Sequence, residues 1–363
     1  MSSPITPQVA APIDLFDRSP EEISALLRPM GAPSYRGMQV FQWIHRKDAA
    51  SFDAMSNLPE DLREWLTANA CLTRLEPVEV LDSVDGSQKL LFDAGGGRRY
   101  SAVLMPSADR VTLCISSQVG CRMGCRFCLT ATLGFQRNLT ASEIVGQVQA
   151  AARLLPAGSR ISNVVFMGMG EPLDNLDAVL RAVRIITHRE GLRVAQRRTT
   201  LSTVGILDRL AEVVESGTGV SIAISLCATT DDVRGDVVPA SRRHGNLQAL
   251  VDTLVRLPLP HGHSFTIEYT LMDGVGDSID DARRLSRMLA LFPNKVNLIP
   301  FNPWPGAPFR RSSDTAIKAF RRFLADKNHR VSVRTSRGLD IGAACGQLDG
   351  KGLPAGESPD RKG

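Results

Sequence analysis

Four of the chain's seven cysteines lie within one short segment, CISSQVGCRMGCRFC, which runs from Cys114 to Cys128. Cys121, Cys125 and Cys128 form a C-x3-C-x2-C array. Three thiolates on one loop can hold three irons of a 4Fe-4S cluster, and the fourth iron then stays open to another ligand. A structural zinc site is the main alternative, but it needs four protein ligands and no further CxxC or HxxxH pair completes it. Buried thiols without a metal are the remaining alternative.

The composition is that of a globular protein, with 43% hydrophobic and 22% charged residues in a chain of 363. The N-terminal stretch MSSPITPQVAAPIDLFDRS lacks the basic and apolar regions of a secretory signal. No apolar run is long enough to span a bilayer. We therefore expect a cytoplasmic protein, in which a cysteine cluster more often binds metal or catalyses than forms structural disulfides.

The elements that must position this array alternate between β-type and helical patterns. Apolar β-type runs recur at RVTLCIS, SNVVFMG, RTTLST, GVSIAISL, FTIEYTLM, KVNLIPF and RVSVRT. Between the first two runs, Thr140 and Glu143 form a capping box that opens a helix with one apolar stripe. Strand and helix alternate about six times, which predicts an α/β fold with a parallel sheet. We expect a partial (β/α)6 barrel over residues 106–340, with an open doubly wound sheet as the alternative.

Four further segments flank this core. Residues 1–12 are expected to be a flexible leader, and 13–75 a small helical module with the character of an RNA-binding domain. In that module, Ser19 caps a helix that ends at Gly31, and LPEDLREWLTANA places its apolar residues on one helical face. Residues 76–105 contain short β-type runs broken by Asp-Gly and Gly-Gly-Gly turns, which predicts a β linker. Residues 341–363 form a C-terminal segment that carries Cys345 and ends in a disordered tail.

The motif MGMGEP follows a run that reads as a buried strand, one β/α unit after the cysteine array. The carboxyl ends of parallel strands are where such folds bind ligands. Gly168 and Gly170 permit close approach of the backbone to a ligand, and Glu171 offers a carboxylate to an ammonium group or a hydroxyl. We therefore predict a ligand site here.

The cysteine spacing followed by a β/α pattern resembles the radical S-adenosylmethionine (SAM) superfamily, in which SAM chelates the open iron and is cleaved to a 5'-deoxyadenosyl radical. Two cysteines outside the array, Cys114 and Cys345, narrow the resemblance to the RlmN/Cfr family of radical SAM RNA (adenine) methyltransferases. The chain resembles a divergent member over residues 12–350. The matching segments are TLCISSQVGCRMGCRFCLTATLGFQRNLTASEIVGQV, MGMGEPLDN, TLSTVG, NLIPFNPWPGAPFRRSS and RGLDIGAACGQL.

The resemblance implies specific roles for individual residues. Cys121, Cys125 and Cys128 would hold the cluster. Cys345 would accept a methyl group from one SAM, and the radical from a second SAM would remove hydrogen from that S-methyl group so that its carbon adds to the adenine. Cys114 would then release the tethered RNA through a transient disulfide with Cys345. The residues that match SAM contacts in the family are Gly170, Glu171, Ser202, Ser225, Leu226, Cys227 and Asn302.

Two positions depart from the family pattern. Cys227 stands where relatives have a histidine, so a side-chain contact to SAM would be altered while a backbone contact would survive. Ser101 stands where relatives have a glutamate that is proposed to accept the ring proton. A hydroxyl is a poor base near neutral pH. Another group, such as Cys114, would then take this proton, or the substrate would differ.

The function implied is methylation of carbon 2 of an adenosine in 23S ribosomal RNA, with transfer RNA as a further substrate. The alternatives are methylation of carbon 8, as in the Cfr branch, a paralogue that binds RNA and SAM without turnover, and an iron-sulfur electron carrier. An RNA partner agrees with the net charge of +5 and with recurring arginine groups such as Arg242 with Arg243. A flavodoxin or ferredoxin would donate electrons. We expect a monomer with no membrane partner.

Overall fold

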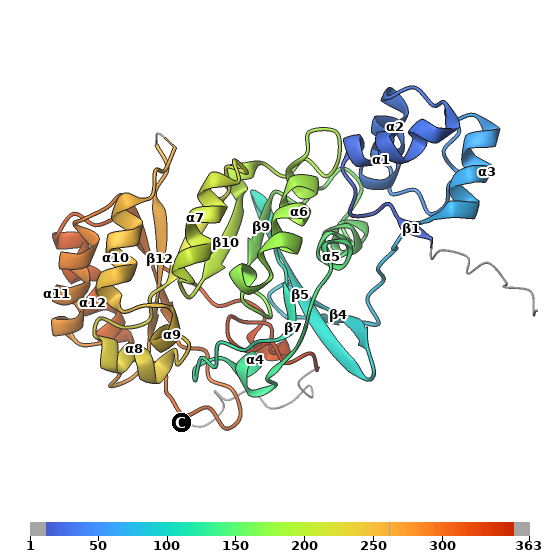
Figure 1. Ribbon diagram of the computed structural model, residues 1–363. Helices are drawn as coiled ribbons and strands as arrows, with labels where there is room; N and C mark the ends of the chain where they lie inside the picture. Colours follow the sequence, from blue (N-terminus) through green and yellow to red (C-terminus); the bar gives the residue numbers. More distant parts are fainter. Residues whose placement is uncertain (1–11, 261, 352–363) are drawn as a thin grey trace, which may run out of the picture.

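A single ten-stranded sheet organises the chain in the computed structural model, which describes residues 12–260 and 262–351 (Figure 1). Its strand order is β14-β13-β12-β11-β10-β9-β6-β5-β4-β3. The predicted leader, apart from Pro12, and the predicted tail beyond Lys351 lie outside the described residues. Within the described residues, no helix is long and apolar enough to cross a membrane.

The parallel part of the sheet runs through seven strands in the order of the chain. They are β6 (Arg110–Cys114), β9 (Asn163–Phe166), β10 (Thr199–Thr203), β11 (Ser221–Ser225), β12 (Phe265–Leu271), β13 (Asn294–Pro300) and β14 (Val331–Val333). The helices that connect them are α5 (Ala141–Arg153), α6 (Leu176–Thr187), α7 (Leu207–Glu215), α10 (Leu247–Arg256), α11 (Ile279–Leu289) and α12 (Asp314–Asp326).

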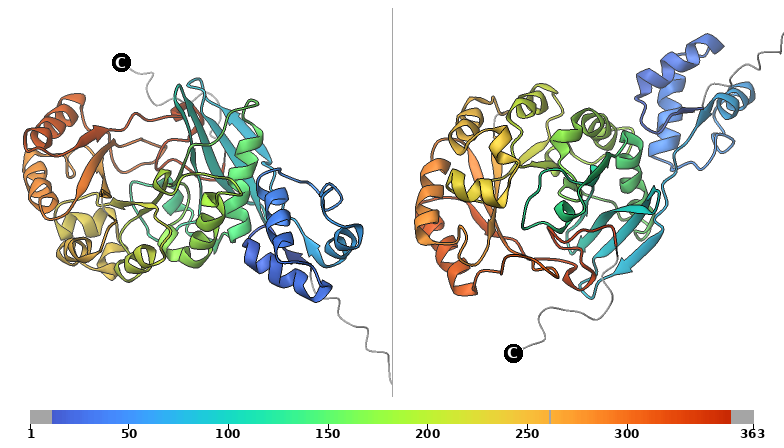
Figure 2. Two further views of the ribbon diagram at one scale, coloured as in Figure 1. Left: turned by 90° about the horizontal axis from the view of Figure 1, so that it is seen from above. Right: turned by 60° about the horizontal axis from the view of Figure 1, so that its bottom comes forward.

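These helices form an outer layer around the strands (Figure 2, right). The order of the parallel strands never reverses, so the sheet has no switch point of the kind that defines a doubly wound fold. The predicted partial (β/α)6 barrel is therefore confirmed, and the doubly wound alternative is wrong. The barrel interior opens at the carboxyl ends of the strands, where ligand sites are expected.

The segment predicted to be a β linker extends the sheet instead. Its strands are β3 (Glu79–Asp82), β4 (Gln88–Gly95) and β5 (Arg98–Ser107), and they pair in antiparallel fashion. β5 also pairs with β6 in a register that places Val103 opposite Cys114. The backbone groups at the edge of β6 thus find partners in β5, which a free linker would leave unpaired. This extension carries side chains into the barrel interior.

The N-terminal module contains α1 (Pro20–Leu27), α2 (Tyr35–His45) and α3 (Glu60–Asn69), together with a parallel pair of two-residue strands, β1 (Ile13–Asp14) and β2 (Ala70–Cys71). The predicted cap is confirmed, because the Glu22 N–H donates to the Ser19 hydroxyl at 3.2 Å and the Ser19 N–H donates to Glu22 at 2.8 Å. The module packs beside α5 and α6 (Figure 1), where Gln149 of α5 donates to the Ile44 carbonyl at 2.8 Å.

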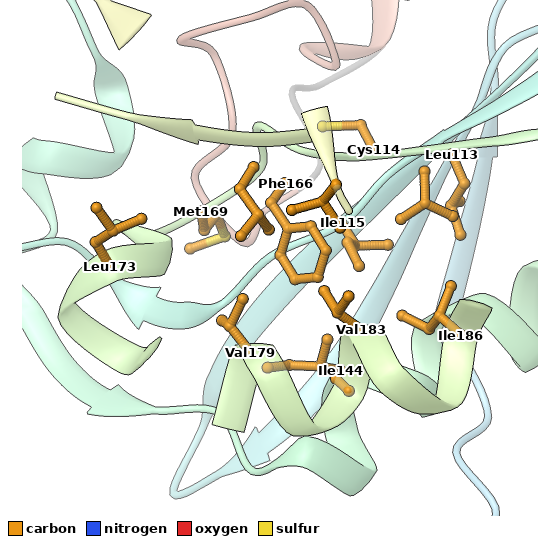
Figure 3. Close-up of a cluster of buried hydrophobic side chains, with 14 of the residues drawn as sticks. Leu113, Cys114, Ile115, Ile144, Phe166, Met169, Leu173, Val179, Val183 and Ile186 are labelled. Atoms are coloured by element: carbon orange, nitrogen blue, oxygen red, sulfur yellow. The ribbon is translucent and has the colours of Figure 1, made fainter. Parts of the chain in front are cut away.

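Side-chain alternation along β6 determines which residues face the barrel interior. Leu113 and Ile115 point toward α5 and α6 and pack among Ile144 and Val183, whereas Cys114 lies on the opposite side of the strand (Figure 3). Successive side chains of a strand point to opposite faces. The predicted capping box at the start of α5 is confirmed, with the Glu143 N–H 3.1 Å from the Thr140 hydroxyl. The helical layer is thus fixed against one face, and the Cys114 thiol is left on the other.

Candidate active site

The loop with the cysteine array lies between β7 (Gln118–Gly120) and α4 (Leu129–Thr132), and β7 pairs with β8 (Phe135–Asn138) across it. Backbone bonds hold the loop at both ends. The Cys121 N–H donates to the Gly134 carbonyl at 3.2 Å, and the Cys128 N–H donates to the Cys125 carbonyl at 3.0 Å. All three cysteines of the array line one cavity of about 150 Å³.

The donor set in this cavity fits an iron-sulfur cluster. Burial raises the pKa of the Cys121 thiol to about 12, and it raises the pKa of Cys125 and Cys128, with the repulsion of neighbouring thiolates adding to the effect. A bound metal cation removes this cost because it takes the place of the protons. Within residues 12–260 and 262–351, no three His, Cys, Asp or Glu side chains form a site for a single ion. A cubane cluster needs no such group, because each thiolate binds a different iron.

The same cavity collects most of the side chains predicted to contact SAM. Its lining includes Gly170, Glu171, Ser202, Ser225, Cys227 and Asn302, which lie at or just beyond the carboxyl ends of β9, β10, β11 and β13. Leu226 does not line it; this side chain is buried, and its N–H donates to the Glu268 carbonyl at 3.0 Å. The site therefore occupies the ligand-binding end of the barrel.

Glu171 is held rigidly at the cavity wall. Its carboxylate accepts from the Leu173 N–H at 3.1 Å and from the Val204 N–H at 2.9 Å, and the side chain is buried. Burial raises its pKa to about 7 despite these two hydrogen bonds. The preceding Gly170 has φ of +101°, and a Cβ there would lie 2.6 Å from the side chain of Gln118. Only glycine fits this approach of two backbone segments.

Cys227, at the first departure from the family pattern, has φ of +64°. Few non-glycine residues adopt this left-handed conformation, and Asn and His are among the more frequent. Its sulfur lies 3.9 Å from the Thr270 hydroxyl, and burial raises its pKa to about 11. The cavity wall therefore has a neutral thiol at this position. The backbone of Cys227 is in a left-handed conformation that a histidine also tolerates.

Cys345 reaches the cavity from the other end of the chain. It follows a short 3-10 helix, η4 (Leu339–Ile341), on a segment without strands. The Asn302 amide donates to the Cys345 carbonyl at 3.0 Å, and the Thr130 hydroxyl donates to the Leu348 carbonyl at 2.5 Å. These bonds hold the Cys345 segment against the loop that carries the cysteine array.

Cys114 lines a second, smaller cavity of about 40 Å³ rather than the first. The two cavities share part of their walls, and Cys345 and Arg334 belong to both. Burial and, to a smaller extent, the Cys345 thiolate together raise the pKa of Cys114 to about 12, and the Arg334 guanidinium opposes both. The two cysteines predicted to form a transient disulfide thus meet in one small cavity.

Ser101, the second departure, lies on β5 and is fully buried. Its hydroxyl finds no hydrogen-bond partner among the described residues, and it lines neither cavity. The two carboxylates in the wall of the larger cavity are Glu171 and Glu268. The structure therefore offers no contact through which Ser101 could act as a base.

Sequence reasoning missed three charged residues around the site. Arg334 follows β14, and Glu268 lies on β12 with both its oxygens near the Asn297 amide, at 3.2 and 3.1 Å. Lys89 on β4 is fully buried and donates to the Gly342 and Lys351 carbonyls at 3.2 and 2.7 Å. A charged residue inside or directly after an apolar run was the available signal, as in VSVR for Arg334.

Comparison with known proteins shows which families this chain resembles. The family model described as "Ribosomal RNA large subunit methyltransferase N-terminal domain" matches residues 13–72, and the radical SAM superfamily model matches residues 115–285. A dual-specificity RNA methyltransferase RlmN of Geobacter sulfurreducens is 47% identical over 93% of this chain and 92% of its own length. The corresponding protein of Geotalea uraniireducens is 44% identical over 93% and 97%.

A solved structure agrees with these matches. The crystal structure of a radical SAM methyltransferase from Sphaerobacter thermophilus superimposes with a TM-score of 0.87 at 42% identity, over 94% of this chain and all of that one. Membership of the radical SAM superfamily implies SAM and a 4Fe-4S cluster as cofactors. On the combined evidence of the barrel, the N-terminal module and these relatives, the chain belongs to the RlmN family of SAM-dependent, radical SAM RNA methyltransferases.

Proposed function

We propose that this enzyme methylates carbon 2 of an adenosine in RNA through an S-methylated Cys345. The observation that carries the proposal is the position of Cys345, which lines both the cavity of the cysteine array and the small cavity that holds Cys114. A thiol at this junction can accept a methyl group on one side and be attacked by a second thiol on the other. An electron carrier would use neither position.

The roles of the protein side chains follow from this arrangement. Cys121, Cys125 and Cys128 hold the cluster, which together with SAM supplies the 5'-deoxyadenosyl radical. The Cys345 thiolate attacks the methyl carbon of SAM, so a carbon-sulfur bond forms to Cys345 and the bond to the sulfonium breaks. The methyl carbon bonds to the adenine after one hydrogen atom has left the S-methyl group, and the adduct then gives up one electron, which would return to the cluster, and the ring proton. The Cys114 thiolate then attacks the Cys345 sulfur. A disulfide forms, and the bond from Cys345 to the tethered carbon breaks with its electron pair on carbon, which takes up a proton.

The contacts to SAM are proposed from the cavity wall. Glu171, Ser202, Ser225, Cys227 and Asn302 offer polar atoms at the carboxyl ends of the strands, and Gly170 allows the backbone to approach. Leu226 contributes through its backbone, because its side chain is buried away from the cavity. With Ser101 outside the cavities, Cys114 is the proposed acceptor of the ring proton. It gives this proton up again as its sulfur attacks Cys345, and the released carbon takes the proton up.

Exposed arginines beside the site support binding of RNA. Arg242 and Arg243 lie on α9 (Ser241–His244) and form no ion pair with the described carboxylates. The preceding Ala240 donates its N–H to the Met123 carbonyl at 3.2 Å, which fixes this helix to the loop of the cysteine array. Two cations at the mouth of the barrel suit a phosphate backbone whose adenosine enters the cavity.

The description of the N-terminal family model supports ribosomal RNA of the large subunit, proposed here to be 23S, as a substrate. The relatives' name, dual-specificity RNA methyltransferase, supports a second kind of substrate, which we propose is transfer RNA. We further propose that the enzyme acts as a monomer in the cytoplasm. A flavodoxin or ferredoxin would supply its electrons.

The test is analysis of the nucleosides formed when the cluster-loaded enzyme acts on RNA with SAM and a reductant. We expect 2-methyladenosine and consumption of two SAM molecules per product, both abolished by Cys345→Ala. 8-Methyladenosine would replace the carbon 2 assignment with the Cfr-type reaction. Binding of RNA and SAM without any methylated adenosine would identify a paralogue that has lost turnover, and would overturn the proposal.

A further inference from the structure

Arg334 lies where the cavities of the barrel meet. It directly follows β14, and its N–H donates to the Leu298 carbonyl at 2.8 Å. Its side chain lines the cavity of the cysteine array, the small cavity of Cys114, and a third cavity of about 630 Å³ on the inner face of the sheet. One guanidinium nitrogen lies 3.3 Å from the Met167 sulfur. This guanidinium is therefore next to both cysteines that the proposed reaction uses.

The charge on Arg334 has no fixed partner. Among the described residues it forms no ion pair with a carboxylate. Its pKa is raised by the charges of Cys345, Glu268 and Cys114, in decreasing order of effect. Glu268 is itself bound by the Asn297 amide. A partly buried cation without a paired anion is costly, and it is therefore suited to a negative charge that appears during the reaction.

Resting on the function proposed above, we propose that Arg334 is a positioning residue that balances one negative charge, carried first by the Cys345 thiolate and then by the Cys114 thiolate. Both steps require a thiolate, because the protonated thiol is a poor nucleophile. Arg334 lines the small cavity with both sulfurs and serves each in turn. A single cation is sufficient, because the two thiolates are needed at different stages.

The charge on Cys345 also favours one order of the two steps. Burial is the main cause of the raised pKa of Cys114, and while Cys345 is a thiolate in the same small cavity its charge raises that pKa as well. Transfer of a methyl group converts Cys345 into a neutral thioether, and this repulsion ends. Burial, which raises the pKa of Cys114, is then opposed by Arg334, which lowers it. Cys114 therefore becomes a better nucleophile only after Cys345 has been loaded.

A second arginine provides a matched control. Arg337 also lines the small cavity, but its guanidinium is bound to the Asp85 carboxylate at 3.0 Å and to the Pro106 carbonyl at 3.1 Å. Its charge is already paired. Arg337→Gln thus removes a cation from the same cavity wall without removing the one that the thiols face.

The experiment measures how fast methyl methanethiosulfonate modifies Cys114 as a function of pH in the cluster-loaded enzyme, with peptide mass spectrometry as the readout. We expect Arg334→Gln to raise the midpoint, seen as modification about 10- to 1,000-fold slower at a fixed pH below it, which corresponds to the 1 to 3 pH units that a nearby opposite charge typically contributes. For both Arg334→Lys and Arg337→Gln, the midpoint for modification of Cys114 should stay near that of the wild type. Cys345→Ala, and separately methylation of Cys345 by SAM, should lower the midpoint.

A second readout is release of tethered RNA in a single turnover, which Arg334→Gln should slow at neutral pH and recover at higher pH. The proposal is overturned if Arg334→Gln shifts neither pH profile, or if Arg337→Gln shifts them equally. Failure of the proposed function has a different signature. Cys345 would then never gain a methyl group, although the Cys114 midpoint would still respond to Arg334→Gln and Cys345→Ala.

Discussion

Two segments bring cysteines to the same cavity by different physical means. The loop of residues 115–129 combines local backbone bonds, such as the one from Cys121 to the Gly134 carbonyl, with distant ones, such as the one from Arg126 to the Val237 carbonyl. The C-terminal segment of residues 335–351 is held by Asn302, which binds the Cys345 carbonyl, and by partners more than two hundred positions away. Lys89, Asp85 and Thr130 all bind it, with Asp85 accepting from the Gly338 N–H at 2.9 Å.

The difference matches the two tasks. Ligands of a cluster need fixed spacing, which a short loop with local backbone bonds provides. Cys345 must serve two cavities, and its segment has little regular structure and is anchored on both sides of the thiol. The comparison teaches that the spacing of the cysteine array is a local property of the sequence, whereas the position of Cys345 depends on contacts from several distant parts of the fold.

The largest predicted effect follows from a substitution in the loop that carries the cysteine array. Cys125→Ala removes a buried thiol of the array that is a proposed cluster ligand, and we expect no iron-sulfur absorption and complete loss of methylation. Cys227→Ala is the matched control, because Cys227 is also a buried thiol in the same cavity wall but stands outside the array. Iron content and the visible spectrum after anaerobic purification provide the measurement. Equal loss of iron in both variants would contradict the assignment of ligands to the array.

A smaller effect should come from the anchor of the C-terminal segment. Lys89→Met removes a buried ammonium that holds the Gly342 and Lys351 carbonyls and the Asp349 carboxylate, at 3.2, 2.7 and 3.3 Å. A displacement of about 1 Å at a reacting group can cost about 100-fold in rate. We expect a loss of that order in methylation of Cys345, with the iron content unchanged.

The measurement for Lys89→Met is the rate of methyl transfer from labelled SAM to the protein, compared with the exposed Lys318→Met as control. Loss of the cluster together with the methyl transfer would show that the two segments are not independent, and the comparison would fail.

The smallest predicted effect is the difference between alanine substitutions at two glycines, one in each segment. Gly124 and Gly346 both have positive φ, at +70° and +83°. Alanine at either position costs about 1–2 kcal/mol in this conformation. At Gly346 the new Cβ would also lie 3.3 Å from the Phe127 carbonyl, whereas at Gly124 the nearest atoms belong to Pro239 at 3.9 Å.

We therefore expect both variants to be less stable in thermal unfolding, but Gly346→Ala to lose methylation of Cys345 by about tenfold more than Gly124→Ala, which corresponds to about 1.4 kcal/mol. An equal loss in the two variants would mean that contact with Phe127 has no role in placing Cys345.

The sequence predicted those features that depend on neighbouring residues. The caps at Ser19 and Thr140 and the parallel strands follow from local chemistry and periodicity, and all are present in the structure. The spacing of the cysteine array likewise indicated a shared loop. Alternation along β6 separates Cys114 from Leu113 and Ile115, which is also a local property.

Other features depend on pairing between distant segments. The strands of residues 76–105 look like a linker in the sequence, because nothing local shows that β5 will pair with β6. For Lys89 and Arg334 the sequence shows only a charged residue inside or directly after an apolar run. It does not show their partners, which lie far along the chain or in a cavity formed by several strands. The meeting of Cys114 and Cys345 was expected only from the resemblance to the family.

The most direct test of the central claim uses the Cys114→Ala variant, loaded with cluster and supplied with SAM, a reductant and RNA. Without the resolving thiol, the carbon that joins Cys345 to the adenine cannot be released. We predict an RNA fragment attached to the Cys345 peptide in mass spectrometry, absent from the wild type and from the Cys114→Ala, Cys345→Ala double variant. Free methylated RNA at the wild-type rate, with no adduct, would contradict the account.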